Sequence, residues 1–203
     1  MDIGFVTTRL TARSAPLWMI LSAAALLFAA AAGTANEKLA DQFAVRLHHI
    51  QQNGMSATPD TTPTVLPDDE GNAYFTAGRV KLPASVQQLR YSTTPGSVNA
   101  IARIDFDVLT QNSTSNNPLL SLFSGVHDVR VIADASAQNG TATVVAQSVE
   151  IDGIPVPRMA LEYFVKKYLT SKFPNVGMTS HFKLPSRVDS AKVETAKVVV
   201  YQR

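Results

Sequence analysis

The segment from Val98 to Val108 alternates between apolar and polar side chains, and this pattern constrains the fold more than any other feature of the chain. Apolar residues occupy every even position, whereas Asn99, Arg103, Asp105 and Asp107 occupy most of the odd ones. Successive side chains point to opposite faces of a β-strand, so a period of two predicts a strand with one buried face. Such a strand is typical of an antiparallel sheet that packs on one side only.

Turn signals place further strands before and after this one. Pro95-Gly96 and Asn139-Gly140 each separate two segments of strand character, and Asn-Gly favours the type I′ turn of a tight hairpin. The predicted strands are 86–91, 98–108, 127–137, 141–151, 188–193 and 197–201, with a further short strand suggested at 64–66.

Two segments carry the apolar spacing of amphipathic helices. Residues 36–52 form the first, and Pro157 is well placed to begin the second, which carries a broad apolar face. Gly54 is expected to end the first helix, and Asp68 to cap a third, shorter one. The sequence therefore predicts an α+β domain, in which an antiparallel sheet of about six strands wraps against two main helices.

Residues 1–35 have the organisation of a secretory signal peptide. Arg9 and Arg13 precede an apolar stretch from Ala15 to Ala32, and Gly33 and Ala35 are small residues suited to cleavage after Ala35. An uncleaved anchor is the alternative, because this stretch approaches the length that spans a bilayer. Either way, we expect the folded part to be periplasmic or secreted, and an uncleaved segment would tether it.

After that segment we expect a single domain, residues 36–203. Its predicted parts are an N-terminal helix at 36–52, a linker at 53–67 and helix-hairpin units at 68–203. Lys81-Leu82-Pro83 with Val86 recurs as Lys183-Leu184-Pro185 with Val188, each time before a predicted hairpin. This recurrence indicates either an internal duplication or coincidence.

Few residues suggest catalysis or metal binding. The chain has no cysteine, which excludes disulfides, a thiol nucleophile and a thiolate metal site. His48 and His49 are adjacent on a predicted helix, so their side chains diverge and cannot face one metal ion. Asp105 and Asp107 share the polar face of a strand, where solvated charge is the simpler interpretation. We therefore expect no enzyme, no metal and no cofactor, although a cluster of both aspartates with His127 around an open cleft would favour an enzyme.

Charge is distributed unevenly along the chain. Residues 36–156 hold 7 basic and 12 acidic side chains, a net charge of −5, whereas residues 157–203 hold 9 and 3, a net charge of +6. The basic part either forms a solvated surface or contacts anionic lipid headgroups at a membrane. The sequence lacks the interleaved aromatic and basic residues that would favour a nucleic-acid partner.

Many alanines fall in predicted strands, although alanine is a poor strand residue and fills little volume. Two explanations remain open: helices pack closely against the sheet, or the sheet leaves a groove or tunnel for an apolar ligand. The residues expected to line such a groove are Val98, Ala100, Ala102, Ile104, Phe106, Val108, Phe164 and Tyr168.

A resemblance favours the second explanation. The segment from Asp68 to Tyr74 followed by Lys-Leu-Pro, the strand at 98–108, the connector at 119–123 and the run at 149–157 resemble a group of bacterial envelope proteins. Those proteins are similar to periplasmic phospholipid-binding proteins of the tubular lipid-binding (BPI-like) type. The resemblance implies a strongly curved antiparallel sheet around long helices.

It also implies non-covalent binding of a lipid or another apolar molecule between the sheet and the helices, with no catalytic residue. A ligand-free interaction or assembly module of the cell envelope, with a filled core, is the alternative.

Overall fold

The structure, a computed structural model, describes residues 17–110, 124–170, 173 and 175–203; only the backbone is described for 17–32, 109–110 and 168. The chain divides into two compact units, residues 1–35 and Asn36–Arg203, and the description below concerns the second. Residues 1–16, where the expected signal peptide begins, lie outside the described part. Among the described residues, no helix is both long and apolar enough to cross a membrane.

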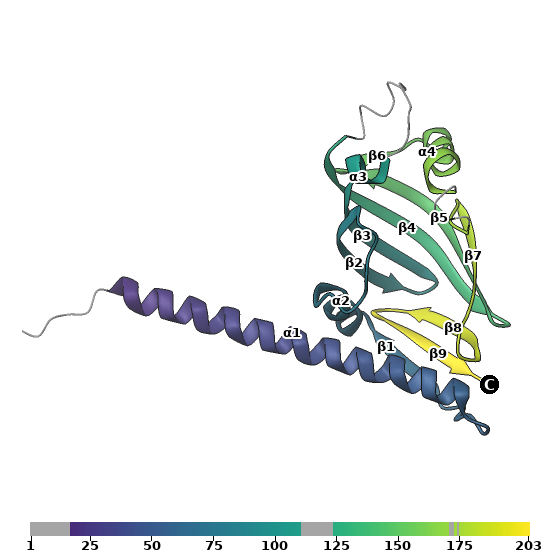
Figure 1. Cartoon of the computed structure of the whole chain (residues 1–203), viewed down its shortest axis with the longest axis horizontal. Helices are drawn as coiled ribbons and strands as arrows, with labels where there is room; N and C mark the ends of the chain where they lie inside the picture. The colour runs from purple at the N-terminus through teal and green to yellow at the C-terminus, as the bar shows by residue number, and fades with distance from the viewer. Residues whose placement is uncertain (1–16, 111–123, 171–172, 174) are drawn as a thin grey trace, which may run out of the picture. The chain divides into compact units, whose positions relative to one another are not determined.

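The second unit has an α+β architecture built on one large antiparallel sheet, as the alternating segments predicted (Figure 1). In chain order its elements are α1 (Leu17–Met55, entering this unit at Asn36), β1 (Thr64–Pro67), α2 (Asp68–Thr76), β2 (Val86–Thr94), β3 (Ser97–Asp105), α3 (Phe106–Thr110), β4 (Val126–Gln138), β5 (Thr141–Ile151), β6 (Ile154–Pro155), α4 (Arg158–Phe164), the π-helical turn η2 (Val165–Leu169), β7 (Thr179–Lys183), β8 (Val188–Glu194) and β9 (Lys197–Gln202).

The sheet is open and branches at β4. Its main path runs β1-β9-β8-β4-β3-β2. Strand β5 lies on the other side of β4 and also pairs with β6 and β7. The described residues thus form nine strands and four α-helices, where the sequence predicted about six strands and two main helices. Of the three strands outside that count, β1 corresponds to the short strand suggested at 64–66. The other two, β6 and β7, are 2 and 5 residues long, too short for their alternation to stand out.

The strongest predicted strand ends earlier than expected. β3 stops at Asp105, and the predicted strand residues Phe106 and Val108 lie in α3. The cause is local, because the Asp105 carboxylate accepts the backbone N–H groups of Asp107 at 3.0 Å and Val108 at 3.1 Å. An acceptor in this position caps a helix and competes with continued strand pairing.

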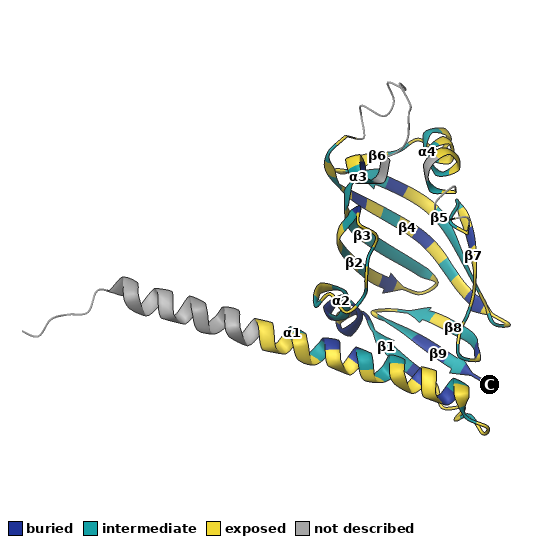
Figure 2. Cartoon of the chain, in the orientation of Figure 1, coloured by how far each residue is buried: buried dark blue, intermediate teal, exposed yellow. Residues whose placement is uncertain are grey.

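Side chains alternate between the two faces of the long strands. Along β4, Val129, Ala133 and Ala137 are buried, and the residues between the inward-facing ones are exposed (Figure 2). The inner face continues across neighbouring strands, since Val131 of β4 lies opposite Ala100 of β3 and Val149 of β5. The sheet therefore has one apolar inner face and one mainly polar outer face.

Helix α2 protects the free edge of β2. The Asn72 side chain pairs with the backbone of Tyr91, donating to its carbonyl and accepting its N–H, both at 2.8 Å. The buried Asp68 carboxylate accepts the Thr93 N–H at 2.6 Å and the Thr93 hydroxyl at 2.9 Å. Asp68 thus binds the strand edge, and the expectation that it caps α2 was wrong. These contacts satisfy backbone groups that an exposed edge would offer to another chain.

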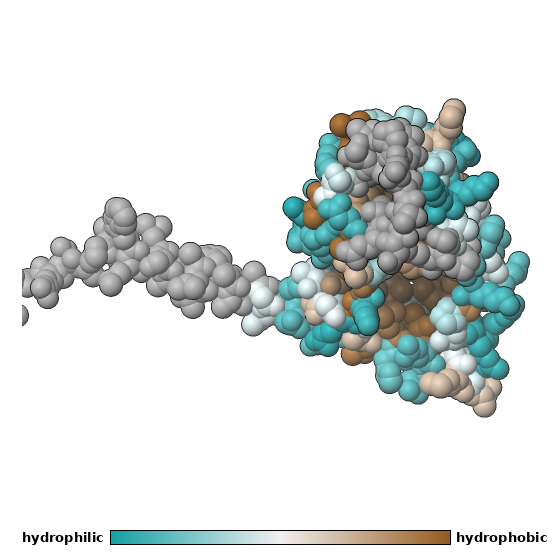
Figure 3. Space-filling model, turned by 45° about the horizontal axis from the view of Figure 1, so that its top comes forward, coloured by the Kyte–Doolittle hydropathy of each residue, from teal (hydrophilic) through white to brown (hydrophobic). Residues whose placement is uncertain are grey.

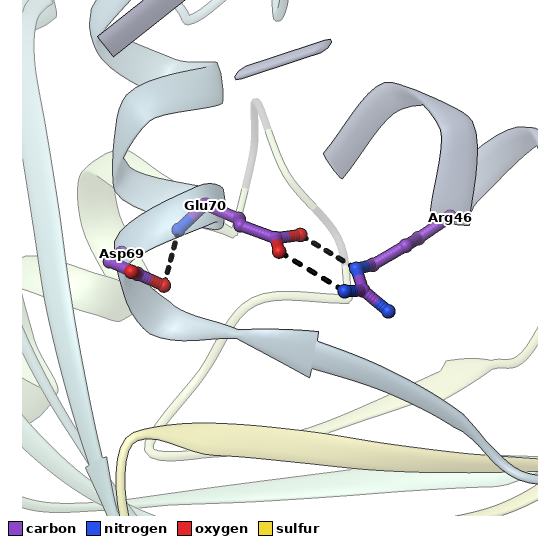
Figure 4. A network of polar contacts seen from close by, with 3 residues as sticks. All are labelled: Arg46, Asp69 and Glu70. Carbon is purple, nitrogen blue, oxygen red and sulfur yellow. Dashed lines mark hydrogen bonds and ion pairs between the residues drawn. The ribbon is translucent and has the colours of Figure 1, made fainter. Parts of the chain in front are cut away.

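The part of α1 that belongs to this unit packs on α2 and on the β8–β9 hairpin. The Phe43 and Tyr74 rings lie 5.3 Å apart, and Ile50 forms a buried cluster with Val188 and Val200. A forked ion pair joins the two helices, because Arg46 donates to the buried Glu70 carboxylate at 2.7 and 3.2 Å (Figure 4). Figure 4 also shows Asp69 accepting the Glu70 backbone N–H.

A candidate apolar groove

A groove of about 220 Å³ lies between the inner face of the sheet and helix α4. All 16 residues that line it are apolar or glycine. Figure 3 shows a hollow of hydrophobic residues on one face of the molecule, with hydrophilic residues along part of its rim. Binding pockets for small molecules usually mix apolar walls with a few polar groups. A groove with no polar side chain among its described lining residues is therefore suited to hydrocarbon.

The strands supply the floor of the groove through their register. Val129 and Val131 of β4 lie opposite Ile151 and Val149 of β5, and residues directly opposite each other share a face. Ala146, opposite Ala133 across a β-bulge, extends the same floor with a small side chain.

Helix α4 and the π-helical turn supply the roof. Ala160, Leu161 and Phe164 face the groove, and none of the residues of α4 is fully buried. The Thr170 N–H donates to the Val165 carbonyl, five residues earlier, at 2.9 Å. Val165 and Leu169, at the two ends of this turn, both reach the lining. Single π-helical turns occur frequently at functional sites.

The structure brings three of the expected ligand-binding residues together. Ile104, Phe106 and Phe164 line the groove, and the Phe106 and Phe164 rings meet edge to face at 5.9 Å. Of the other expected residues, Val98, Ala100 and Ala102 share the inner face of β3 but lie outside the lining, as does Val108 in α3. The side chain of Tyr168 lies outside the described part.

Most of the lining was not identified from the sequence. The missed residues come from the inner faces of β4 and β5, from α4 and η2, and from the segment before β7. Alternation in 127–137 marks the inward residues of β4 as clearly as it marks those of β3. In 141–151 the alternation changes phase between Ala146 and Val149, at the β-bulge, so the sequence marks the inward residues of β5 less clearly. The segment before β7, which contributes Val176, Gly177 and Met178, has no comparable signal.

An ion pair lies beside the groove residue Phe106. The Phe106 ring contacts the His127 imidazole edge to face at 5.8 Å, and His127 Nδ1 lies 2.6 Å from the Asp152 carboxylate. His127 Nε2 lies 2.9 Å from the Ser124 carbonyl, so both ring nitrogens face acceptors. The hydrogen bond to Asp152, followed by the one to Ser124, raises the pKa of His127, and the bond from His127 lowers the pKa of Asp152.

The substitution His127→Asn is expected to destabilise the protein in a pH-dependent way. The raised pKa means that His127 contributes its full stabilisation below the ordinary value of 6.5 and loses it as the pH rises through the raised value. Asp152 contributes above 3.8 and loses its contribution as the pH falls through its lowered pKa. The difference in melting temperature between wild type and variant should therefore be largest between pH 3.8 and 6.5, and should shrink under alkaline conditions.

His181→Asn serves as the control, because His181 pairs with the hydroxyl of Thr143 and not with a carboxylate. A melting-temperature difference for His127→Asn that stays constant with pH would contradict the assignment.

The acidic residues near His127 bind backbone groups. Asp105 caps α3, and the Asp107 carboxylate accepts the Gly125 N–H at 3.1 Å. No group of three or more metal-ligating histidine or acidic side chains occurs among the described residues. In this part of the chain, His127 therefore pairs with Asp152, and the arrangement of His127 with both aspartates around a cleft is not formed.

Comparison of the chain with protein-family models, curated proteins and solved structures found no match. The functional argument therefore rests on the groove itself.

Proposed function

We propose that the groove binds the hydrocarbon part of a lipid, or of another apolar molecule, without forming a covalent bond. The observation that carries this proposal is the lining, which contains no polar side chain among the 16 residues that the structure describes there. An apolar cavity of about 150 Å³ is enough to hold benzene. A groove of about 220 Å³ can therefore accept a segment of an acyl chain while the polar head stays outside.

The energetics favour an occupied groove. Burial of a hydrocarbon chain contributes about 0.8 kcal/mol per CH₂ group. Without a ligand, the apolar walls of the groove face water, which is unfavourable by about 25 cal/mol per Å² of apolar surface. A bound chain supplies the contacts that the inner face otherwise lacks. We propose that the protein binds this ligand outside the cytoplasm, and the signal-peptide pattern of residues 1–35 supports this location.

This function requires no reacting group, so we propose a binding protein and not an enzyme. Its fold would serve as a tubular lipid-binding-like container, with the sheet as one wall and α4 as the other. Support for that comparison comes from the sequence resemblance and from the position of the groove.

Native mass spectrometry of the full chain, purified from the envelope fraction of the producing cell, tests the proposal. We expect an added mass that matches a phospholipid or an isoprenoid, and organic extraction should release the same molecule. A clean apo mass, with no uptake when lipids are added back, would contradict the proposal and favour the ligand-free interaction module.

A further inference from the structure

Large apolar side chains are exposed where β6 leads into α4. Met159 is 83% exposed, Ile154 70% and Tyr163 44%. Met159 and Tyr163 lie one turn apart on α4, so they share a face. The groove residues Leu161 and Phe164 occupy the other side of the helix. We refer to Ile154, Met159 and Tyr163 as the α4 corner.

Three basic side chains lie on the same helical segment as Met159 and Tyr163. Arg158, Lys166 and Lys167 are exposed on the same helical segment. Lys167 Nζ lies 5.5 Å from the centre of the Tyr163 ring and donates to its hydroxyl at 3.1 Å. The one acidic residue of this segment, Glu162, accepts a hydrogen bond from Arg158 at 2.9 Å. The segment 158–169 therefore has a net charge of +2.

Several other basic residues of the C-terminal part already have anionic or aromatic partners. Arg203 pairs with Asp189 at 2.7 Å and Lys197 with Glu194 at 3.3 Å, while Lys192 lies over the Tyr201 ring. On the segment 158–169, exposed apolar side chains coincide with a net charge of +2.

We propose that the α4 corner docks on the surface of an anionic lipid membrane. Apolar side chains would enter the headgroup boundary, and the lysines would bind lipid phosphates with their aliphatic stems lying along the apolar layer. Both the apolar protrusion and the positive charge fit this one partner. Docking goes beyond ligand binding in the groove, because it uses the opposite face of α4 and does not require an occupied groove.

The absence of cysteine allows the docking to be measured at a single site in the full chain. In Met159→Cys, the thiol is labelled with an environment-sensitive fluorophore, and the chain is reconstituted into vesicles whose acyl chains carry bromine as a quencher. One vesicle contains phosphatidylcholine alone and the other an equimolar mixture with phosphatidylglycerol. Thr195→Cys, in the exposed β8–β9 turn, is the matched control.

We expect quenching at position 159 in the mixed vesicles only, and none at position 195. Changing Lys166 and Lys167 to glutamine should lower the ratio of docked to undocked chains by about thirtyfold, because each basic side chain near an anionic surface contributes about fivefold. The substituted positions 159, 166, 167 and 195 are all exposed, so the variants should fold.

Three results would overturn the proposal: no quenching of the label at position 159, equal quenching at 159 in the two kinds of vesicle, or equal quenching at positions 159 and 195. Ala160→Phe, which blocks the groove, should leave quenching at 159 unchanged, so the two proposals can fail separately.

Discussion

Replacing Gly54 by alanine is expected to lower the free energy of unfolding by about 3 kcal/mol, the upper range for forcing extra atoms into a packed site. An alanine Cβ at this position would meet the backbone of Ser186, with its carbonyl carbon at 2.6 Å and its Cα at 2.7 Å. Real Cβ atoms do not approach so closely, so backbone must move. On helix propensity alone, alanine would be better than glycine by about 1 kcal/mol. The prediction that Gly54→Ala destabilises the protein therefore depends entirely on the contact with Ser186.

Neither side of this contact is free to shift. Ser186 and Arg187 have φ angles of 55° and 56°, and the Val188 N–H donates to the Pro185 carbonyl at 3.0 Å, which is the geometry of a type I′ turn. The Ser186 carbonyl also accepts from the buried Gln202 amide at 2.6 Å.

The same Gln202 amide binds α1 directly. It donates to the Ile50 carbonyl at 2.8 Å, and its oxygen accepts from Asn53 at 3.0 Å. Movement of the helix away from Ser186 would break these buried hydrogen bonds, each costly to leave unmade.

Chemical denaturation of the full chain measures the effect. Gly33→Ala, in a chain that keeps residues 1–35, is the control, because Gly33 lies on the same helix but belongs to the other compact unit. That variant should be neutral or slightly stabilised. Equal stability of the two variants would show that the approach of Gly54 to Ser186 is not a constraint.

The Gly54 contact also shows where sequence reasoning fails. The residue was predicted to end its helix, and α1 does end one residue later, at Met55. The close approach of this glycine to a residue 132 positions later was not predicted. Local propensity contains no information about such a partner. By contrast, β5 has the predicted bounds, because its turn residues and its alternation are both local signals.

The recurring Lys-Leu-Pro motif gives an intermediate case. In both copies the valine N–H donates to the proline carbonyl, at 2.8 Å for Val86 and 3.0 Å for Val188, and the hairpin that follows has a register shift after its first residue. The turns differ in hand, since positive φ angles occur in the second copy only. The motif thus predicted the entry to a hairpin but not its detailed backbone.

For the candidate groove, the sequence could place residues on a face of the sheet but could not show which part of that face the groove covers. Ile104 and Ala100 alternate in the same way along β3, yet only Ile104 reaches the lining. The difference arises from where α4 crosses the sheet, a contact between segments about 60 residues apart. A lining assembled from six helices and strands and two connecting segments therefore becomes visible only in three dimensions.

Replacing Ala160 by phenylalanine is expected to weaken binding of a lipid in the groove by about two orders of magnitude. Ala160 lines the groove from α4, so a ring at this position occupies space that the proposed ligand needs. Excluding about four CH₂ groups would remove about 3 kcal/mol of binding free energy, which is roughly a hundredfold or more in affinity. The fold should persist, because α4 has no fully buried residue and the ring fills an existing space.

Met159→Phe provides the matched control, since it adds an aromatic ring at the neighbouring residue on the exposed side of the same helix. Lipid recovered by extraction from equal amounts of the two variants separates a ligand in the groove from lipid that merely accompanies the N-terminal segment. Loss of the bound molecule in Ala160→Phe alone would place it under α4. Equal recovery from both variants, with unchanged melting temperatures, would show that the groove is not the binding site.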